Sequence, residues 1–214
     1  MSEREVLDMD VLFVGAGPAS LAGAIHLKRL LRESGQEANV AVLEKASEVG
    51  AHSLSGAIVD PRALRELFPN YNDADFPFEA KVTEEHLYYL TATKKIPFPF
   101  VPPPMSHHNC FVTSLGKLTR WLGGICEDEG VDIFCGFAGT ELLYDGDQVI
   151  GVRTGDRGID KNGEKKTQFE PGADIHAKVV ILGEGTRGSL TKKLINRHEP
   201  MQEGNPKSEE RRGG

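Results

Sequence analysis

The chain has 214 residues, 39% of them apolar and 27% charged, a composition that is typical of a globular protein and excludes a wholly disordered one. The formal net charge of -7 argues against nucleic-acid binding, which requires a basic surface. No run of 18 apolar residues predicts a transmembrane helix.

The first 44 residues predict a strand, a helix and a second strand. Residues 9–14 are apolar without alternation, as in a parallel strand covered on both faces. Apolar residues at helical spacing follow until Ser34-Gly35, which predicts the end of the helix. Residues 40–43 predict another buried strand, and Glu44 stands at its carboxyl end. The whole segment has the length of a βαβ unit.

The rest of the chain predicts shorter elements. From about residue 198 to 214 almost nothing is apolar, so we expect a disordered tail there. In chain order the sequence predicts a loop over 48–56, a short helix over 61–68, an extended segment over 96–105 that its prolines exclude from helices, a helix over 116–129, strands over 131–134, 141–144 and 149–152 with a hairpin turn at Asp145-Gly146, a polar loop over 155–172, and a buried strand over 178–182 that ends at Gly183.

A glycine motif lies between the first strand and the helix. In Gly15-x-Gly17-x-x-Ser20 the first glycine permits a tight turn, the second lets a pyrophosphate approach, and the small Ser20 lets the helix pack on the strand. Backbone N–H groups at the helix start favour phosphate. Glu44 can accept hydrogen bonds from ribose hydroxyls, and its charge disfavours the 2′-phosphate of NADP. We interpret this as a dinucleotide site rather than a structural turn.

The residues alone leave FAD and NAD open. The loop over 48–56 is rich in glycine and serine, which would let it wrap over a ligand longer than adenosine and so favours FAD. A plain surface loop has the same composition.

Several stretches resemble the electron-transfer flavoprotein–ubiquinone oxidoreductases. The most specific is Gly50-Ala-His-x-Leu-Ser-Gly56, which separates this family from general FAD monooxygenases and from the related geranylgeranyl reductases. The resemblance covers roughly residues 8 to 195. Further matching stretches are Val14-Gly-Ala-Gly-Pro-Ala-Ser-Leu21, Asp60-Pro61, Glu66-Leu-Phe-Pro69, Val82-Thr-Glu84, Leu115-Gly116, Trp121-Leu122, Gly136-Phe-Ala138, Asp156-x-Gly-Ile159 and Lys161-x-Gly163.

The resemblance implies an α/β fold: a Rossmann-like FAD-binding domain of the glutathione-reductase type, with a parallel sheet and an inserted β-rich segment, incomplete at the carboxyl end. Residues 1–75 would form the first FAD-binding segment, 76–115 the start of a quinone- and membrane-facing insertion, 116–197 the return to the FAD domain, and 198–214 the tail. Enzymes of this family hold FAD, one [4Fe–4S] cluster and a quinone site. They pass electrons from electron-transfer flavoprotein to ubiquinone at a membrane surface.

Carried over by position, the resemblance implies no catalytic acid or base, because the flavin performs the redox chemistry. It implies a membrane-facing patch of Phe98, Phe100, Val101 and Met105, although a proline-rich connector folded onto its own domain fits these residues as well. The implied cofactor-binding residues are Gly15, Ala16, Gly17, Pro18, Ala19, Ser20, Glu44, Lys45, Gly50, Ala51, His52, Ser55, Gly56, Ala138, Gly183 and Gly185.

The chain departs from the family in three parts. The family's cluster cysteines lie far towards its carboxyl end, and Cys110, Cys126 and Cys135 form no C-x-x-C pair, so we expect reduced thiols and no metal ligands here. The family's later Gly-Asp turn and most of its quinone domain have no counterpart. We therefore expect a truncated or frame-shifted product that retains FAD weakly or not at all in isolation.

Two other functions fit parts of the pattern. One is a geranylgeranyl-reductase-like FAD enzyme, and the other is a non-catalytic dinucleotide-binding remnant. The polar, acidic amino terminus is not typical of a transit peptide, so we expect the cytoplasmic face of a bacterial inner membrane, or the cytoplasm for a truncated form.

Overall fold

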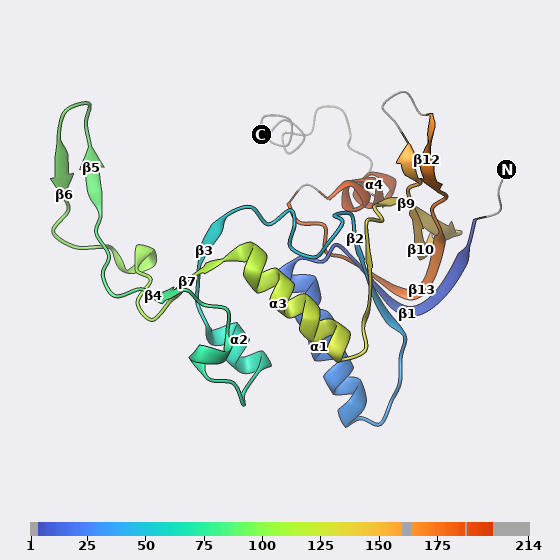
Figure 1. Ribbon diagram of the computed structural model, residues 1–214, viewed down its shortest axis with the longest axis horizontal. Helices are drawn as coiled ribbons and strands as arrows, with labels where there is room; N and C mark the ends of the chain where they lie inside the picture. The colour runs from blue at the N-terminus through green and yellow to red at the C-terminus, as the bar shows by residue number, and fades with distance from the viewer. Residues whose placement is uncertain (1–3, 160–163, 187, 199–214) are drawn as a thin grey trace.

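The main sheet is the centre of the fold. In the computed structural model, which describes residues 4–159, 164–186 and 188–198, six strands join this sheet in the order β8-β2-β1-β13-β10-β9 (Figure 1). The sheet is mixed rather than wholly parallel as expected, because a hairpin forms one edge. The parallel strands are β8 (Asp132–Cys135), β2 (Val40–Glu44), β1 (Val6–Val14) and β13 (Asp174–Leu182), and β10 (Gln148–Thr154) and β9 (Gly139–Asp145) are antiparallel.

Two helices cover one face of this sheet. The chain forms α1 (Pro18–Glu33) directly after β1, and α3 (Leu115–Asp128) packs beside α1. Gly17 is the amino-terminal cap of α1, and Gly35, with φ +68°, follows its carboxyl-terminal cap, which confirms the predicted helix end. Apolar side chains of both helices and of β1 and β2 form the core on this side, including Phe13, Leu21, Ile25, Val42 and Leu122.

On the opposite face of the sheet a second core forms, to which β9 and β10 contribute. The turn at Asp145-Gly146 joins β9 to β10, as the sequence predicted, and these strands bring Leu142 and Val152 against Leu12 and Leu43. The short helix α4 (Ser189–His198) closes this second core with the fully buried Leu190. The sequence did not predict α4, because few of its residues are apolar and only Leu190 is buried.

A smaller sheet lies next to the helices. It consists of β3 (Gly56–Val59), β7 (Phe111–Ser114) and β4 (Ala80–Lys81). The helix α2 (Arg62–Leu67) and a 3₁₀ turn at Asp73–Asp75 follow β3. An aromatic cluster fixes this region against α3, with ring centroids 5.1–6.2 Å apart, and its members are Phe68, Tyr71, Phe76 and Trp121.

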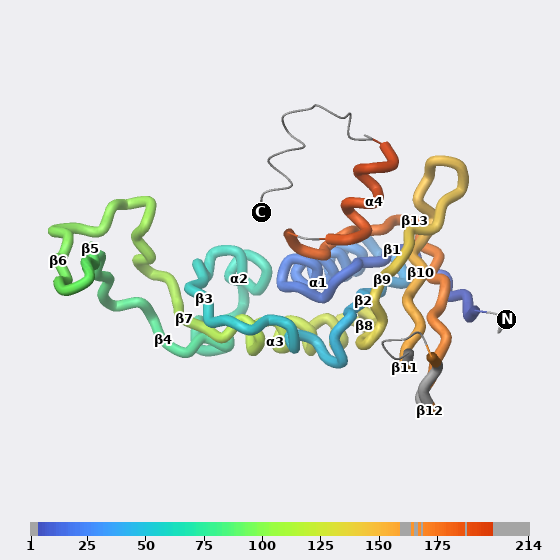
Figure 2. The backbone as a smooth tube through the Cα atoms, turned by 90° about the horizontal axis from the view of Figure 1, so that it is seen from above, coloured from blue at the N-terminus to red at the C-terminus, as the bar shows by residue number. Residues whose placement is uncertain are grey.

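A two-stranded hairpin extends from the smaller sheet, and we call residues 87–106 the arm. Its strands are β5 (Tyr88–Leu90) and β6 (Lys95–Pro97). Figures 1 and 2 show the arm at the opposite end of the molecule from β10 and β12. The prolines do exclude an α-helix here, but Pro103–Met105 form a 3₁₀ turn, which the sequence had excluded with the other helices.

Two predicted segments differ from the structure, and a third lies mostly outside the described residues. The polar segment predicted as a loop over 155–172 contains β11 (Arg157–Ile159) and β12 (Lys165–Glu170), because a protruding hairpin needs no apolar face. The strand predicted over 178–182 starts earlier, at Asp174. It is not buried on both faces, since Val179 and Ile181 are 51% and 38% exposed. Most of the predicted tail, residues 199–214, lies outside the described residues, and His198 ends α4.

Candidate functional site

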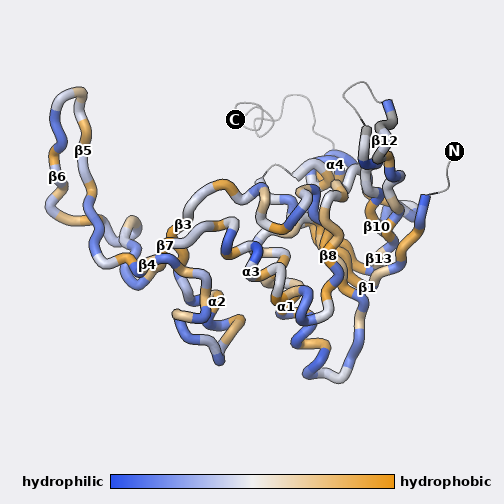
Figure 3. Tube along the Cα trace, in the orientation of Figure 1, coloured by the Kyte–Doolittle hydropathy of each residue, from blue (hydrophilic) through white to orange (hydrophobic). Residues whose placement is uncertain are grey.

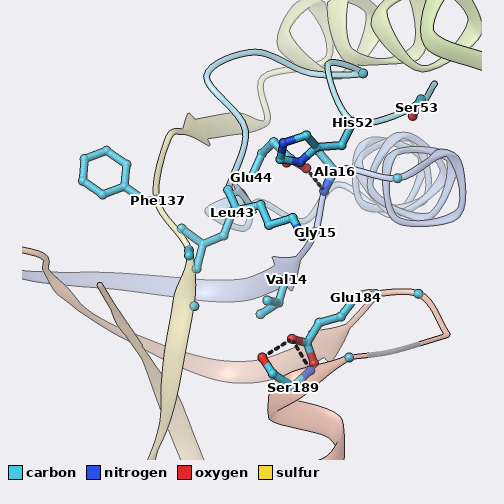
Figure 4. A pocket seen from close by; sticks show the side chains of 18 of the residues that line it. Val14, Gly15, Ala16, Leu43, Glu44, His52, Ser53, Phe137, Glu184 and Ser189 are labelled. Carbon is cyan, nitrogen blue, oxygen red and sulfur yellow. Dashed lines mark hydrogen bonds between the residues drawn. The ribbon is translucent and has the colours of Figure 1, made fainter. Parts of the chain in front are cut away.

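A cavity of about 790 Å³ opens at the carboxyl ends of β1, β2 and β13 (Figure 4). Ligands of open α/β sheets bind at this edge, where the glycine turns after the strands meet. The structure thus gathers residues from the start and from the end of the described chain. The predicted site residues that line the cavity are Gly15, Ala16, Gly17, Glu44, Lys45, Gly50, His52, Ala138, Gly183 and Gly185.

The turns after β1 and β13 touch each other. Gly15 has φ +99°, and a Cβ atom there would lie 2.6 Å from the Gly183 carbonyl oxygen. A Cβ atom on Gly183 would in turn collide with the Ser20 hydroxyl. The Gly183 N–H donates to the Val14 carbonyl over 2.9 Å. Both positions therefore require glycine, and Ser20 serves the packing of the two turns instead of lining the cavity.

The amino end of α1 is open towards the cavity. Its cap Gly17 makes no side-chain hydrogen bond, and the first turn of the helix holds no acidic residue. A Cβ atom on Gly17 would meet nothing within 4 Å, and Pro18 occupies the first position, where an N–H has no partner within the helix. Free backbone N–H groups and the helix dipole together make this end suited to an anion.

Glu44 is held rigidly beside this helix end. Its Oε2 accepts the Ala16 N–H over 3.0 Å and its Oε1 accepts the Ala46 N–H over 2.7 Å. Figure 4 shows the Glu44 carboxylate against Ala16 at the cavity edge. Each carboxylate oxygen can accept a further hydrogen bond, so the group is oriented before any ligand arrives.

The loop after β2 forms another part of the cavity wall. Gly50 has φ +80°, and a Cβ atom there would lie 2.7 Å from the Gly116 carbonyl at the start of α3. This close approach holds His52 and Ser53 at the cavity. The end of the predicted loop is not a loop, because Gly56 begins β3 and pairs with Ser114.

Glu184 lies within the turn from Gly183 to Gly185, which the resemblance implies as cofactor-lining, but the sequence did not predict the contacts of its side chain. Its Oε1 accepts the N–H groups of Ser189 and Leu190 over 3.1 and 3.2 Å, and its Oε2 accepts that of Thr191 over 2.9 Å. Burial would raise the pKa of Glu184, but these hydrogen bonds outweigh it and hold the pKa below its usual value. The only signal in the sequence was an acid directly between Gly183 and Gly185.

The sequence-predicted set and the cavity differ in both directions. Predicted residues that do not line the cavity are Pro18, Ala19, Ser20, Ala51, Ser55 and Gly56. Ser53 and Glu184, which line the cavity, lie within the loop from Gly50 to Gly56 and the turn from Gly183 to Gly185 that the resemblance implies. Cavity residues that were not predicted are Val14, Leu43, Leu115, Phe137, Gly139, Thr186, Gly188 and Ser189.

The predicted membrane-facing residues lie on the arm, away from the cavity. Phe98, Phe100 and Met105 are exposed, whereas Val101 is half-buried. The arm carries further exposed apolar side chains, among them Tyr89 and Leu90. Figure 3 shows hydrophobic and hydrophilic stretches along the arm. Within the described part of the chain, no helix is long and apolar enough to cross a membrane.

The cysteines do not gather into a site. Among residues 4–159, 164–186 and 188–198 there is no group of three or more His, Cys, Asp or Glu side chains that could hold a metal ion. All three cysteines are free thiols. Burial raises the pKa of Cys126 to about 12, and its Sγ donates to the Leu21 carbonyl, so this thiol packs between α3 and α1.

No protein-family model matches the chain, but curated proteins do. A probable electron transfer flavoprotein-ubiquinone oxidoreductase of Acinetobacter baylyi is 45% identical over 209 residues, which are 95% of this chain and 37% of that protein. The mitochondrial electron transfer flavoprotein-ubiquinone oxidoreductase of Mus musculus is 44% identical over 91% of this chain and 32% of its own length. The chain thus spans about a third of the length of the curated relatives it matches.

Solved structures share the fold at low identity. A geranylgeranyl bacteriochlorophyll reductase-like protein from Thermoplasma acidophilum aligns with a TM-score of 0.57 and 19% identity, over 83% of this chain and 39% of that one. A myxobacterial chondrochloren halogenase, described as FAD-dependent, aligns with a TM-score of 0.53 and 17% identity, over 87% of this chain and 39% of that one. These likenesses confirm the predicted Rossmann-like FAD-binding fold.

Proposed function

We propose that this chain, which belongs by sequence to the electron transfer flavoprotein-ubiquinone oxidoreductases, binds FAD and is the FAD-binding part of such an enzyme. The observation that carries the proposal is the open amino end of α1 beside the fixed Glu44 carboxylate, both on the wall of one cavity. A dinucleotide carries a central pyrophosphate and a neighbouring ribose, which match these two features.

Residues from several parts of the cavity wall have binding or orienting roles in this proposal. The N–H groups at Gly17 and the first turn of α1 would hold the pyrophosphate, and Glu44 would accept the ribose hydroxyls. Lys45, Ala138 and the wall around Gly50 would enclose the remainder. FAD supplies the electron transfer, and no side chain of the cavity needs to act as an acid or base.

For the whole enzyme we propose electron-transfer flavoprotein as the electron donor and ubiquinone as the acceptor. The names of the curated relatives support this. The [4Fe–4S] cluster that the resemblance implies does not fit the described residues, which gather no ligand set. The likeness to the geranylgeranyl reductase-like protein, at 19% identity, supports the fold alone and does not favour a lipid-reducing activity.

Binding of FAD to the isolated chain tests the proposal. In equilibrium dialysis we expect weak but saturable FAD binding that ADP displaces, because the chain spans only about a third of the length of its curated relatives. Glu44→Gln should weaken it, because the variant loses the charge and one acceptor of the ribose. Glu48→Gln is the matched control, since it changes the same charge four residues away at an exposed position outside the cavity. Absence of saturable binding to the folded wild-type chain would leave a non-catalytic remnant as the better description.

We propose further that the arm contacts a membrane surface. Its support is the exposure of Leu90, Phe100 and Tyr89, which are 70%, 68% and 60% exposed on one extended hairpin. Leu90→Ser with Phe100→Ser should reduce co-sedimentation with phospholipid vesicles. Val179→Ser with Ile181→Ser, which removes exposed apolar side chains from the sheet, is the control. Equal loss in both pairs would show non-specific adsorption and overturn the assignment to the arm.

A further inference from the structure

Two carboxylates lie on the cavity wall, on either side of the turn after β1. Figure 4 shows Glu44 on one side of Gly15 and Glu184 on the other. Both line the cavity. Glu44 has a role in the proposed function, whereas nothing yet explains why a second negative charge borders a cavity that would take a pyrophosphate.

Glu184 fills the amino end of a helix. Three consecutive backbone N–H groups of the first turn of α4 donate to its carboxylate, together with the hydroxyls of Ser189 and Thr191. A Cβ atom on Gly188 would lie 2.8 Å from Glu184 Oε2, so glycine leaves room for the carboxylate there. The place that an external anion would take at this helix end is therefore occupied from within the chain.

Three helices begin at the cavity, and they differ in what occupies their amino ends. The first residue of α3, Leu115, lines the cavity, and the Ser114 hydroxyl caps this helix by accepting the Lys117 N–H over 3.4 Å. Both α1 and α4 follow a strand and a glycine turn, and both begin beside the cavity, which Gly17 and Ser189 line. The first turn of α1 has no side-chain cap and no acid. Of the three helix ends, that of α1 therefore has neither a side-chain cap nor an acid, that of α3 has a neutral cap, and that of α4 holds a fixed negative charge.

We propose that Glu184 sets the charge selectivity of the cavity. By occupying the amino end of α4, it excludes a second anion and confines the ligand's phosphates to α1, so that the wall around Gly183 and Gly185 receives an uncharged part of the ligand. The inference rests on the proposed function in naming that part. In FAD it is the hydroxylated chain between the pyrophosphate and the flavin ring.

Sulfate binding to the chain without FAD tests the inference independently of FAD binding. We measure the rise in the urea midpoint of unfolding with sodium sulfate against sodium chloride at equal ionic strength. Glu184→Ala should bind sulfate about fivefold more tightly than wild type, because the vacated helix end attracts an anion. Asp60→Asn is the control: Asp60 accepts the Arg62 N–H at the start of α2, outside the cavity, and its loss should add no sulfate response.

Glu184→Gln keeps the size of the side chain. If Glu184→Ala is unfolded even without urea, the sulfate response of Glu184→Gln is compared with that of wild type instead. Glu184→Gln should show a smaller gain in the same direction. A folded Glu184→Ala chain, judged by circular dichroism, with the sulfate response of wild type would overturn the inference and leave Glu184 a helix cap only. Failure of wild type to bind FAD, with the sulfate gain present, would overturn the proposed function and leave the charge selectivity standing.

Discussion

The chain contains two units of the same kind, each a parallel strand followed by a glycine turn and a helix. The two units differ in how far the strand is buried and in what occupies the amino end of the helix. The unit of β1 and α1 is covered on both faces and leaves its helix end open. The unit of β13 and α4 leaves Val179 and Ile181 exposed and closes its helix end with Glu184. The local unit therefore provides a turn and a helix end, and the surrounding side chains decide whether it binds an anion.

The largest effect should come from breaking the contact between the two units. Gly183→Ala places a methyl group against the Ser20 hydroxyl, and we expect the free energy of unfolding in urea to fall by about 3 kcal/mol. Adding Ser20→Ala removes the hydroxyl and should recover most of the loss. If the two substitutions were simply additive, the contact between the turns would not be what requires glycine at 183.

A matched pair of substitutions measures how differently the two units are covered. Val42 on β2 is fully buried beside the first unit, whereas Val179 on β13 is 51% exposed. Val→Thr keeps the shape and adds a hydroxyl, so Val42→Thr should cost about 2 kcal/mol of unfolding free energy. Val179→Thr should cost less than about 0.5 kcal/mol. Equal costs would show that β13 is covered in solution.

Gly17→Ala separates ligand binding from folding. Its Cβ atom meets nothing within 4 Å, and φ at this position is -77°, so unfolding in urea should be unchanged. The methyl group would lie where the pyrophosphate approaches, and FAD affinity should fall by roughly tenfold. Gly124→Ala is the control, because its Cβ atom also meets nothing and it lies outside the cavity. Unchanged FAD affinity in Gly17→Ala would place the phosphates elsewhere.

The smallest effect is a pH dependence that belongs to the second unit. The folded chain holds the pKa of Glu184 below its unfolded value, because hydrogen bonds outweigh burial. The stabilisation is therefore complete above the unfolded pKa of about 4.3 and is lost as the pH falls through the lower folded pKa. The free energy of unfolding of Glu184→Gln should decline less steeply below about pH 4 than that of wild type. Parallel declines would assign the acid sensitivity to other groups.

The candidate site was predictable where its residues act within one βαβ unit. Gly15, Gly17 and Glu44 stand at fixed distances along the chain from a strand end, and hydrophobic periodicity located those strands. The role of Glu184 was not predictable, because its hydrogen-bond donors belong to α4, a short helix in which most residues are polar. The β11 and β12 hairpin was missed for a similar reason, since most residues of these short strands are polar and form no apolar alternation.

The sequence by itself determined the first strand, the glycine turn, the open helix end and the acid at the end of β2, because each depends on residues within one helix and two strands. Only the tertiary structure decided that the turns of Gly15 and Gly183 meet, that Ser20 packs between them, and that the cavity has two carboxylates and one free helix end. The physical reason is that β1 pairs with β13 although most of the described chain lies between the two strands in the sequence. Local propensities cannot specify a pairing between strands so far apart in sequence, since burial of the shared core selects it.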